Sequence, residues 1–261
     1  MKVVLFVNDS YFSYLLARPL FEKFHDQIQA VVISTKIKGS ASKVVGIFRK
    51  THWRYFVYRL TIELINRINT LFRRRSVSAL IRAYNLKVIS TDNVTCCEEL
   101  KSLLPADLGV AFNFDQILKG TVLGAFTHGV INVHSSYLPK DKGVSPVLWA
   151  FARGDSSIWS TIYRMDEGLD SGPIFRQLEI PVESDDTACS LYQRVCAKSG
   201  KELASVVDQV QSAMAHPQSQ PEDLDAKTWS WPDQTHRQMM VESRRKLINL
   251  SDICQMLCKS A

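Results

Sequence analysis

Residues 2–8, KVVLFVN, and residues 29–34, QAVVIS, are two short runs rich in β-branched side chains, and they decide the fold. Runs of this length and composition are typical of buried strands. Between them, residues 11–24 repeat apolar side chains at the three- and four-residue spacing of a helix. Strand, helix and strand in this order predict the start of a parallel, doubly wound sheet, because neighbouring parallel strands are joined by a crossover helix.

The rest of the chain extends this pattern. Further strands are expected at residues 87–90, 108–113, 130–135, 158–165 and 174–181, and a helix over 187–214 follows polar residues suited to capping. The predicted fold class is α/β, Rossmann-like, with a mostly parallel twisted sheet, helices on both faces and a short C-terminal appendage. The turn after the first strand, Asn8-Asp9-Ser10, contains no glycine, which disfavours a dinucleotide there.

Positive charge is concentrated in one segment of the chain. Residues 36–88 contain thirteen Lys or Arg and one acid, a net +12, whereas the whole chain carries +6, so the remainder is −6. Within this segment, residues 53–72 place Trp53, Phe56, Val57, Leu60, Leu64, Ile68 and Leu71 on one stripe of a helix. Such a stripe could lie on a membrane surface, but the prediction is that it packs against the protein's own sheet. The segment also leaves open a nucleic-acid-binding module, whose affinity would fall steeply with salt.

Composition excludes several classes of protein. The chain has 261 residues, of which 46% are hydrophobic and 22% charged, as in globular proteins. No apolar run approaches the ~20 residues of a membrane span, and no leader pattern opens the chain, so we expect a cytoplasmic protein without stable membrane insertion. The six cysteines show no ligand spacing, and no metal is expected.

Three polar side chains in the middle of the sequence form a candidate catalytic group. Asn132 and His134 are two residues apart in an expected strand, so both point to one face. Asp170 ends the turn 165–172, MDEGLDSG. An amide can donate to a developing oxyanion, an imidazole can move a proton near neutral pH, and a carboxylate can orient it. By composition alone, such a trio can also arise by chance.

This region resembles the formyltransferase family that uses 10-formyltetrahydrofolate, which includes methionyl-tRNA formyltransferases and sugar N-formyltransferases. The shared elements run over about residues 107–182: Phe112-Asn113-Phe114-Asp115-Gln116-Ile117-Leu118, Gly129-Val130-Ile131-Asn132-Val133-His134, Ser136, Leu138-Pro139, Gly143, Pro146, Trp149, Thr161-Ile162, and Asp166-Glu167-Gly168-Leu169-Asp170-Ser171-Gly172. The interval of 36 residues between His134 and Asp170 also fits the family. The family often has Arg before the glycine where this chain has Lys142, and Gly-Val-Thr where it has Trp159-Ser160-Thr161.

The resemblance implies a role for each matching residue. His134 would assist attack of an amine on the formyl carbon, Asn132 would stabilise the oxyanion, and Asp170 would favour protonated His134. The donor 10-formyltetrahydrofolate would meet Phe112, Phe114, Gln116, Ile117, Leu118, Ser136, Met165, Asp166 and Glu167. The acceptor would meet Asn8, Ser10, Lys142 and Trp159. No metal is required.

The same resemblance divides the chain into a catalytic domain, 1–214, with a basic helical insertion at about 36–88, and a linker and tail, 215–261. The residues after 214 are too few for the tRNA-binding barrel of methionyl-tRNA formyltransferases, and Asn8-Asp9-Ser10 lacks the phosphate loop of the glycinamide ribonucleotide enzymes. The expected acceptor is therefore a small-molecule amine, most plausibly a nucleotide-linked amino-deoxy sugar, rather than nucleic acid. An aminoacyl or other non-sugar amine, and a catalytically silent folate-binding homologue, stay open. A homodimer is compatible with the sequence, and Trp229 and Trp231 are expected either to anchor the tail or to stack on a base.

Overall fold

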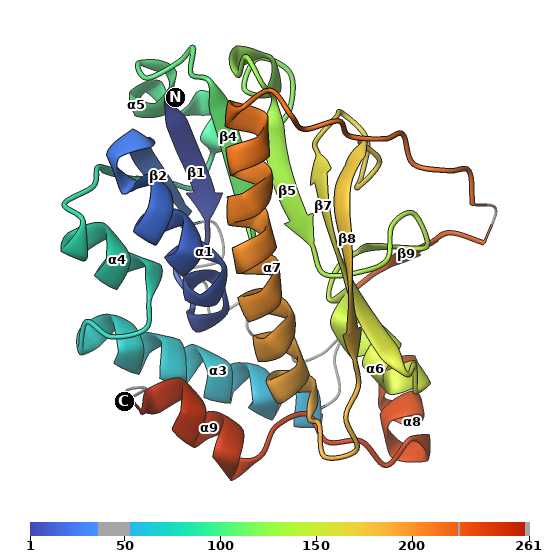
Figure 1. Ribbon diagram of the computed structural model, residues 1–261. Helices are drawn as coiled ribbons and strands as arrows, with labels where there is room; N and C mark the ends of the chain where they lie inside the picture. The colour runs from blue at the N-terminus through green and yellow to red at the C-terminus, as the bar shows by residue number, and fades with distance from the viewer. Residues whose placement is uncertain (36–52, 224, 259–261) are drawn as a thin grey trace.

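A seven-stranded sheet forms the centre of the protein, in the order β3-β2-β1-β4-β5-β7-β8 (Figure 1). The computed structural model describes residues 1–35, 53–223 and 225–258. The strands are β1 (Val3–Val7), β2 (Ile28–Ser34), β3 (Val88–Thr91), β4 (Leu108–Phe112), β5 (Val130–His134), β7 (Ser157–Arg164) and β8 (Ile174–Pro181), and a separate pair joins β6 (Asp141–Gly143) to β9 (Lys227–Trp229). The first five strands of that order run parallel, and β7 is antiparallel to both its neighbours. The predicted fold class is confirmed.

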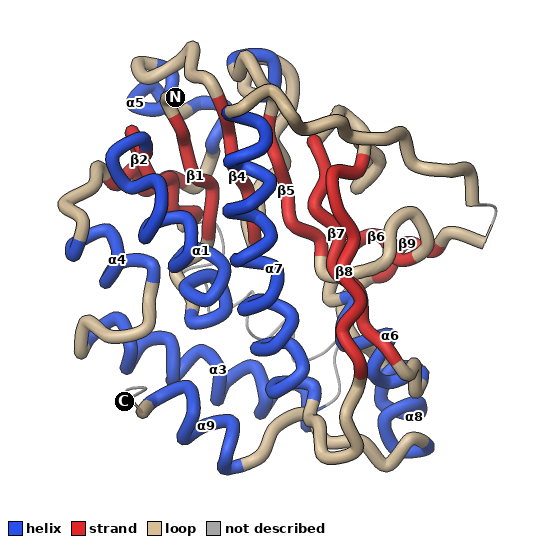
Figure 2. Tube along the Cα trace, viewed as in Figure 1, coloured by secondary structure: helices blue, strands red, loops and turns tan. Residues whose placement is uncertain are grey.

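Helices cover the sheet unequally. On one face lie the long helices α1 (Tyr11–Phe24) and α7 (Ala188–Gln211), packed against each other (Figures 1 and 2). The opposite face is covered mainly by the short α5 (Glu98–Lys101) and by 3-10 turns and loops. The other helices are α3 (Trp53–Leu71), α4 (Val77–Ala83), α6 (Pro146–Arg153), α8 (Gln234–Glu242) and α9 (Leu250–Leu257). Two apolar clusters result, one on each face of the sheet.

Local sequence explains where the main helices begin. Ser10 caps α1 by accepting from Ser13 N at 3.1 Å. Thr187 caps α7, because its hydroxyl oxygen accepts from Ser190 N at 3.0 Å. In return, Thr187 N donates to the Ser190 hydroxyl oxygen. These reciprocal bonds satisfy amides that an α-helix leaves unpaired in its first turn.

The expected packing of the apolar stripe on α3 is wrong. Leu60 is 49% exposed, Leu64 58% and Leu71 75%, and Trp53 and Val57 are exposed as well. The side chains that α3 buries lie on its opposite side: Tyr55, Tyr58, Ile62, Ile65 and Asn69. The helix therefore has two apolar faces, and the one with tyrosines and an amide packs on the protein. The first part of the basic segment, residues 36–52, lies outside the described residues.

The C-terminal part packs back against the rest of the fold. Strand β9 pairs with β6, α8 packs on α6, and α9 lies beside α3 (Figure 1). The Trp229 ring stacks on Trp149 with ring centroids 4.6 Å apart, so Trp229 anchors this segment. The boundary at residue 214 stays a prediction. Among the described residues, no helix is long and apolar enough to cross a bilayer.

Candidate active site

Asn132 and His134 lie at the carboxyl end of β5, in the middle of the sheet. In the antiparallel pairing with β7, Asn132 stands opposite Tyr163 and His134 opposite Thr161. Alternate residues of a strand share a face, so this register puts both side chains on one side of the sheet beside Tyr163. His134 is buried with 8% of its surface exposed, and Asn132 is half-buried.

A tyrosine hydroxyl joins Asn132 and Asp170, two members of the predicted triad of Asn132, His134 and Asp170. Asn132 Nδ2 donates to Tyr163 Oη at 3.0 Å, and Tyr163 Oη donates to Asp170 Oδ1 at 2.9 Å. Burial raises the pKa of Tyr163, and the charge of Asp170 raises it further, so the phenol keeps its proton. One amide hydrogen of Asn132 is used in this chain of bonds. The other remains available to a ligand.

The His134 ring is held by a backbone carbonyl and faces a carboxylate. Its Nε2 lies 3.0 Å from Asp141 O and 3.7 Å from Asp170 Oδ2. Because a carbonyl oxygen only accepts, Nε2 carries the hydrogen in this arrangement and Nδ1 is the basic atom of the neutral ring. Should Nδ1 take a proton, the resulting cation would stand next to Asp170, whose exposed fraction is only 9%.

Asp170 is fixed by hydrogen bonds from three groups in different parts of the chain. It has φ = 48°, a left-handed conformation that Asp tolerates better than most residues. Besides Tyr163, Gly143 N donates to Asp170 Oδ2 at 2.9 Å. Gln220 Nε2 donates to Asp170 O at 3.0 Å and to Gly172 O at 2.8 Å. The segment after residue 214 thus helps to set the position of the carboxylate.

Asp141 links this site to β9 and α6. Its carboxylate accepts both terminal nitrogens of Arg153, at 3.0 and 2.9 Å, and Trp229 Nε1. Its carbonyl accepts Ser136 Oγ in addition to His134. A two-pronged Arg–carboxylate pair is geometrically rigid. The carbonyl that orients His134 is therefore held in place on both sides.

Glycine is required at position 143 in this structure. Gly143 has φ = +89°, and a Cβ there would lie 2.4 Å from Trp229 O. A larger residue would push β6 away from β9 and move the amide that donates to Asp170.

Three of the predicted donor-binding side chains are buried and contact other parts of the protein. Phe112 and Leu118 are 0% and 1% exposed and belong to the two apolar clusters. The Gln116 amide donates to Ser34 Oγ and Thr91 O, both at 2.8 Å, and accepts from Val94 N at 2.7 Å. These side chains hold the loop after β4 on the sheet, so any contact they make with a donor must come from their backbone.

Other predicted donor-binding residues keep exposed surface. Phe114 and Met165 are half-buried and border the same apolar cluster, and Ile117 is 66% exposed. Asp166 and Glu167 are exposed, with Asp166 Oδ1 accepting from Gly168 N and Ser171 Oγ. The predicted Ser136 is buried and donates to Asp141 O.

The predicted acceptor-binding residues come from separate places. The Ser10 hydroxyl caps α1, and Asn8 is half-buried in the same turn. Lys142 lies on β6, beside the glycine that contacts Asp170, and is half-buried. Trp159 is half-buried on β7, where its ring meets the edge of Tyr137 at 4.9 Å.

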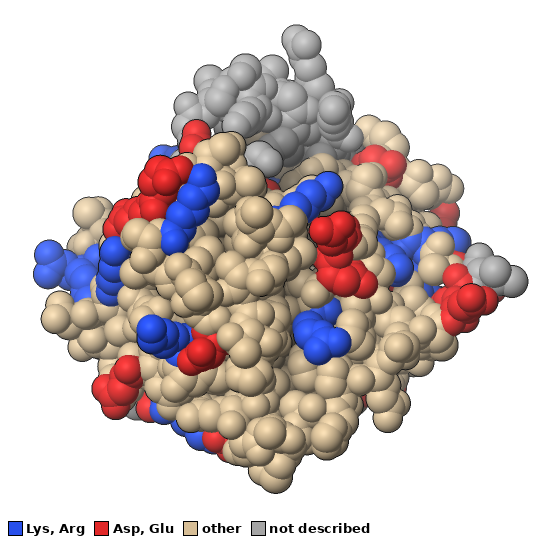
Figure 3. All heavy atoms as spheres, turned by 90° about the horizontal axis from the view of Figure 1, so that it is seen from above, with Lys and Arg blue, Asp and Glu red and all other residues tan. Residues whose placement is uncertain are grey.

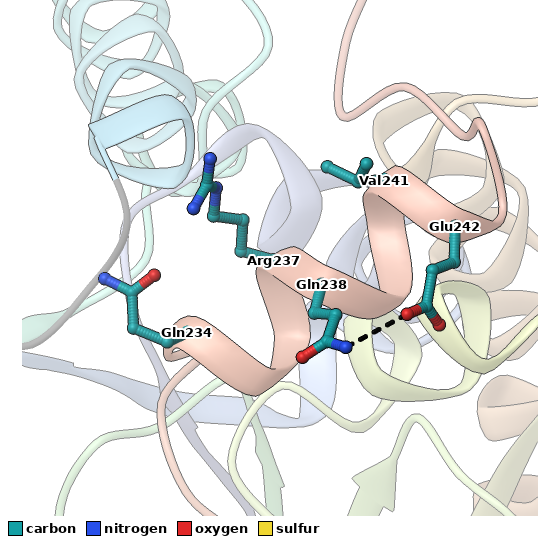
Figure 4. Close-up of a pocket in the computed structure, with 5 residues that line it drawn as sticks. All are labelled: Gln234, Arg237, Gln238, Val241 and Glu242. Atoms are coloured by element: carbon teal, nitrogen blue, oxygen red, sulfur yellow. Dashed lines mark hydrogen bonds between the residues drawn. The ribbon is translucent and has the colours of Figure 1, made fainter.

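Two surface hollows among the described residues lie away from the triad. One is lined by Gln234, Arg237, Gln238, Val241 and Glu242, all from α8 (Figure 4). The other lies around the start of α7 and the loop before α9. Neither contains Asn132, His134 or Asp170. Within the described residues, no cluster of His, Cys, Asp or Glu has the arrangement of a metal site.

Sequence reasoning missed three residues of this site: Tyr163, Asp141 and Gln220. The signal for Tyr163 is the register between β5 and β7, which places it opposite Asn132, but a strand pattern does not reveal register. Asp141 acts through its carbonyl, which any residue has. Gln220 lies in a segment whose composition indicated only a linker.

Known proteins show similarity to this chain in both sequence and structure. Residues 70–207 match the model of the formyl transferase family. A methionyl-tRNA formyltransferase of Acidithiobacillus ferrooxidans is 42% identical over 111 residues, which cover 42% of this chain and 35% of that protein. The matched segments span 35% to 44% of the length of these curated relatives.

Solved structures share the fold. An N-formyltransferase from Helicobacter canadensis, in complex with folinic acid and dTDP-3-aminofucose, superposes with a TM-score of 0.61 at 18% identity, covering 88% of this chain and 71% of that one. A phosphoribosylglycinamide formyltransferase from Anaplasma phagocytophilum gives 0.58 at 20% identity, covering 85% and 94%. With over half of its residues matched by the family model, and with the same fold as these enzymes, the chain belongs to the formyl transferase family.

Proposed function

We propose that this protein transfers a formyl group from 10-formyltetrahydrofolate to a primary amine of a small molecule, namely an amino-deoxy sugar linked to a nucleotide. One observation carries the proposal. Asn132, Tyr163, Asp170 and His134 form one continuous polar network at the end of β5, with an unused amide hydrogen on Asn132 and a basic Nδ1 on His134.

The network supplies what formyl transfer to an amine requires. When bound, 10-formyltetrahydrofolate presents a formyl carbon on a nitrogen leaving group. A new bond forms between the amine nitrogen and that carbon, the bond to the leaving nitrogen breaks, and one proton moves from the amine to the leaving nitrogen. His134 Nδ1 takes this proton, and Asp170 Oδ2, 3.7 Å from the ring, stabilises the cation until the proton is passed on.

Asn132 acts on the formyl oxygen. Its remaining amide hydrogen donates to the negative charge that develops there, an interaction commonly worth about 3 kcal/mol of barrier. Tyr163 fixes the amide for this role because its hydroxyl accepts the first amide hydrogen. Preorganised donors of this kind need no rearrangement when the charge appears.

Residues beside the network fit a folate ring. Phe114 and Met165 border one apolar cluster and keep exposed surface, which suits a flat heterocycle. The backbone of the 165–170 turn offers polar groups next to them. The Asp115 side chain, between Phe114 and Gln116, has a buried Oδ1 without a partner among the described groups, as expected where a ligand supplies a donor.

Two classes of acceptor have support. The Helicobacter canadensis enzyme was solved with dTDP-3-aminofucose, which favours a nucleotide sugar. The 42% identity to a methionyl-tRNA formyltransferase favours an aminoacyl amine instead. Lys142 on β6, beside Gly143, can meet a phosphate of either acceptor and does not distinguish them. Trp159 on β7 would distinguish them if its bulky ring narrows the space around the amine.

A direct assay separates these outcomes. The protein is incubated with 10-formyltetrahydrofolate and either dTDP- and UDP-linked amino sugars or methionyl-tRNA, with Asp170→Asn as background. Release of tetrahydrofolate is followed by absorbance, and products are weighed by mass spectrometry. A formylated sugar supports the proposal, and formylated methionyl-tRNA alone supports the aminoacyl alternative. Folate binding without turnover on any amine would identify a catalytically silent homologue.

A further inference from the structure

The outward face of α3 is apolar along its whole length. At 3.6 residues per turn, Trp53, Val57, Leu60, Leu64 and Leu71 fall within an arc of about 60°. Their exposed fractions run from 49% to 75%, and Phe72, just past the helix, is 61% exposed. We call these six residues the α3 stripe. Large contiguous apolar surfaces of this kind mark interaction sites.

The opposite side of α3 is fully engaged by the fold. Tyr55, Tyr58 and Ile62 are buried in the main core, and Asn69 Nδ2 donates to Met256 O of α9 at 3.2 Å. Asn66 Oδ1 accepts from Tyr11 N at the start of α1 at 2.9 Å. The helix therefore cannot roll to bury its stripe without breaking these contacts.

The charge around the stripe is strongly positive. Residues 53–75 contain six arginines and one glutamate, a net +5. Arg54, Arg59, Arg67, Arg73 and Arg74 are exposed, and the one acid, Glu63, pairs with Arg67 at 3.2 Å. On the face seen from above Figure 1, by contrast, basic and acidic side chains are interspersed (Figure 3).

The sign of this charge decides which partner fits. A symmetric contact with a second copy would place the same patch on both sides and bring +5 against +5. An anionic lipid surface offers negative headgroups to the arginines and hydrocarbon to the leucines. Aromatic rings at both ends of the stripe, Trp53 and Phe72, suit the interface between headgroups and acyl chains.

We propose that the α3 stripe binds reversibly to the surface of an anionic lipid bilayer, with α3 lying in the plane of the interface. The helix has the features of such interfacial helices: an apolar stripe, flanking arginines and modest overall hydrophobicity. It lies at the carboxyl edge of the sheet, next to the start of α1 (Figure 1). No residue proposed for catalysis is on it. Lipid binding and formyl transfer are therefore separable.

Vesicle sedimentation tests this proposal. The protein is mixed with phosphatidylcholine vesicles or with vesicles that also contain phosphatidylglycerol, at low and high salt. Binding is expected to the anionic vesicles and to weaken with salt. Leu60→Gln/Leu64→Gln should lower vesicle affinity by about tenfold or more, because two exposed leucines lose burial in the lipid. Met214→Gln, which changes a residue that is 64% exposed and lies three positions after the end of α7, is the matched control and should bind as the parent does.

A charge variant tests the second half of the argument. Arg67→Gln/Arg73→Gln should weaken binding to anionic vesicles by about fivefold per arginine, whereas Arg237→Gln on α8 should not. Light scattering in the absence of vesicles gives the mass in solution. The proposal is overturned if the parent protein does not sediment with anionic vesicles, or if the leucine variant binds them as well as the parent does. It is also overturned if the parent is a dimer and the leucine variant is a monomer.

Discussion

The loop after β1 and the end of β5 lie on the same edge of the sheet and carry similar side chains, but they use them differently. Ser10 caps α1, and Asp9 accepts from Ser78 N at 3.1 Å and Ser78 Oγ at 2.6 Å at the start of α4. Thr70 Oγ1 adds a longer contact to Asp9 at 3.4 Å. Asn132 and His134 form bonds too, but each leaves one reactive atom unused.

This difference separates structural from chemical use of polar groups. A side chain whose hydrogen-bonding atoms all meet the protein contributes to stability, and its loss should appear in unfolding. A side chain that is oriented by one bond and keeps another atom available is prepared for a ligand. The two regions should therefore respond to mutation in different measurements.

The largest effect is expected at the end of β5. His134→Ala and Asp170→Asn should each lower turnover by about 100-fold or more, because the first removes the proton carrier and the second removes the charge that stabilises it. Binding of folate, followed by fluorescence, should change little. Near-normal turnover in either variant would mean that the chemistry lies elsewhere.

At the loop after β1 the prediction is reversed. Asp9→Ala removes the acceptor of Ser78 N and Ser78 Oγ, and should lower the free energy of unfolding by about 2 kcal/mol, as measured by urea titration. Turnover at a temperature where the variant is folded should stay near that of the parent. A large loss of turnover with unchanged stability would instead place this loop in the acceptor site, as the sequence interpretation of Asn8 and Ser10 requires.

Tyr163 belongs to both categories and sharpens the comparison. Tyr163→Phe should lower kcat by about tenfold with little change in KM, because Asn132 loses the bond that orients it. Tyr84→Phe, far from the site, is the control. An unchanged kcat together with a lower free energy of unfolding would reduce Tyr163 to a packing role.

The sequence patterns that predicted the structure correctly were those compatible with only one local structure. A short run of β-branched residues between polar turns is buried as a strand in most folds, so all seven strands of the main sheet were predicted within one or two residues. The spacing of Asn132 and His134 placed both on one face for the same reason. The strands β6 and β9, of three residues each, are too short for any periodicity to indicate.

The sequence was a poor guide where a side chain or a helix face had two possible environments. Helix α3 has apolar side chains on opposite sides, and periodicity alone cannot say which side the sheet will cover. Gln116 as a donor-binding residue stays a prediction, but its side-chain amide already makes three bonds to residues more than twenty positions away in sequence. Such choices are decided by long-range packing, which a single sequence does not display.

The smallest expected effect concerns the attachment of α8, away from both regions. His236 is buried, its Nε2 lies 3.1 Å from Leu148 O, and its ring meets the edge of Trp149 at 5.3 Å. Burial lowers the pKa of His236 more than the bond to Leu148 O and the charge of Asp233 raise it. The unfolded chain therefore binds a proton at a pH where the folded protein does not. This contribution to stability is complete above the ordinary histidine pKa of about 6.5 and is lost as the pH falls below it.

Thermal unfolding measures this contribution. Between about pH 7.5 and about pH 5.5, the Tm of the parent should fall more steeply than that of His236→Gln, which cannot titrate in this range. His128→Gln, at an exposed position, should keep the slope of the parent, because its ring is in water both before and after unfolding. Parallel Tm curves for the parent and His236→Gln would contradict this prediction. They would mean that His236 can be protonated in the folded protein, which requires the contact between α8 and α6 to open before the protein unfolds.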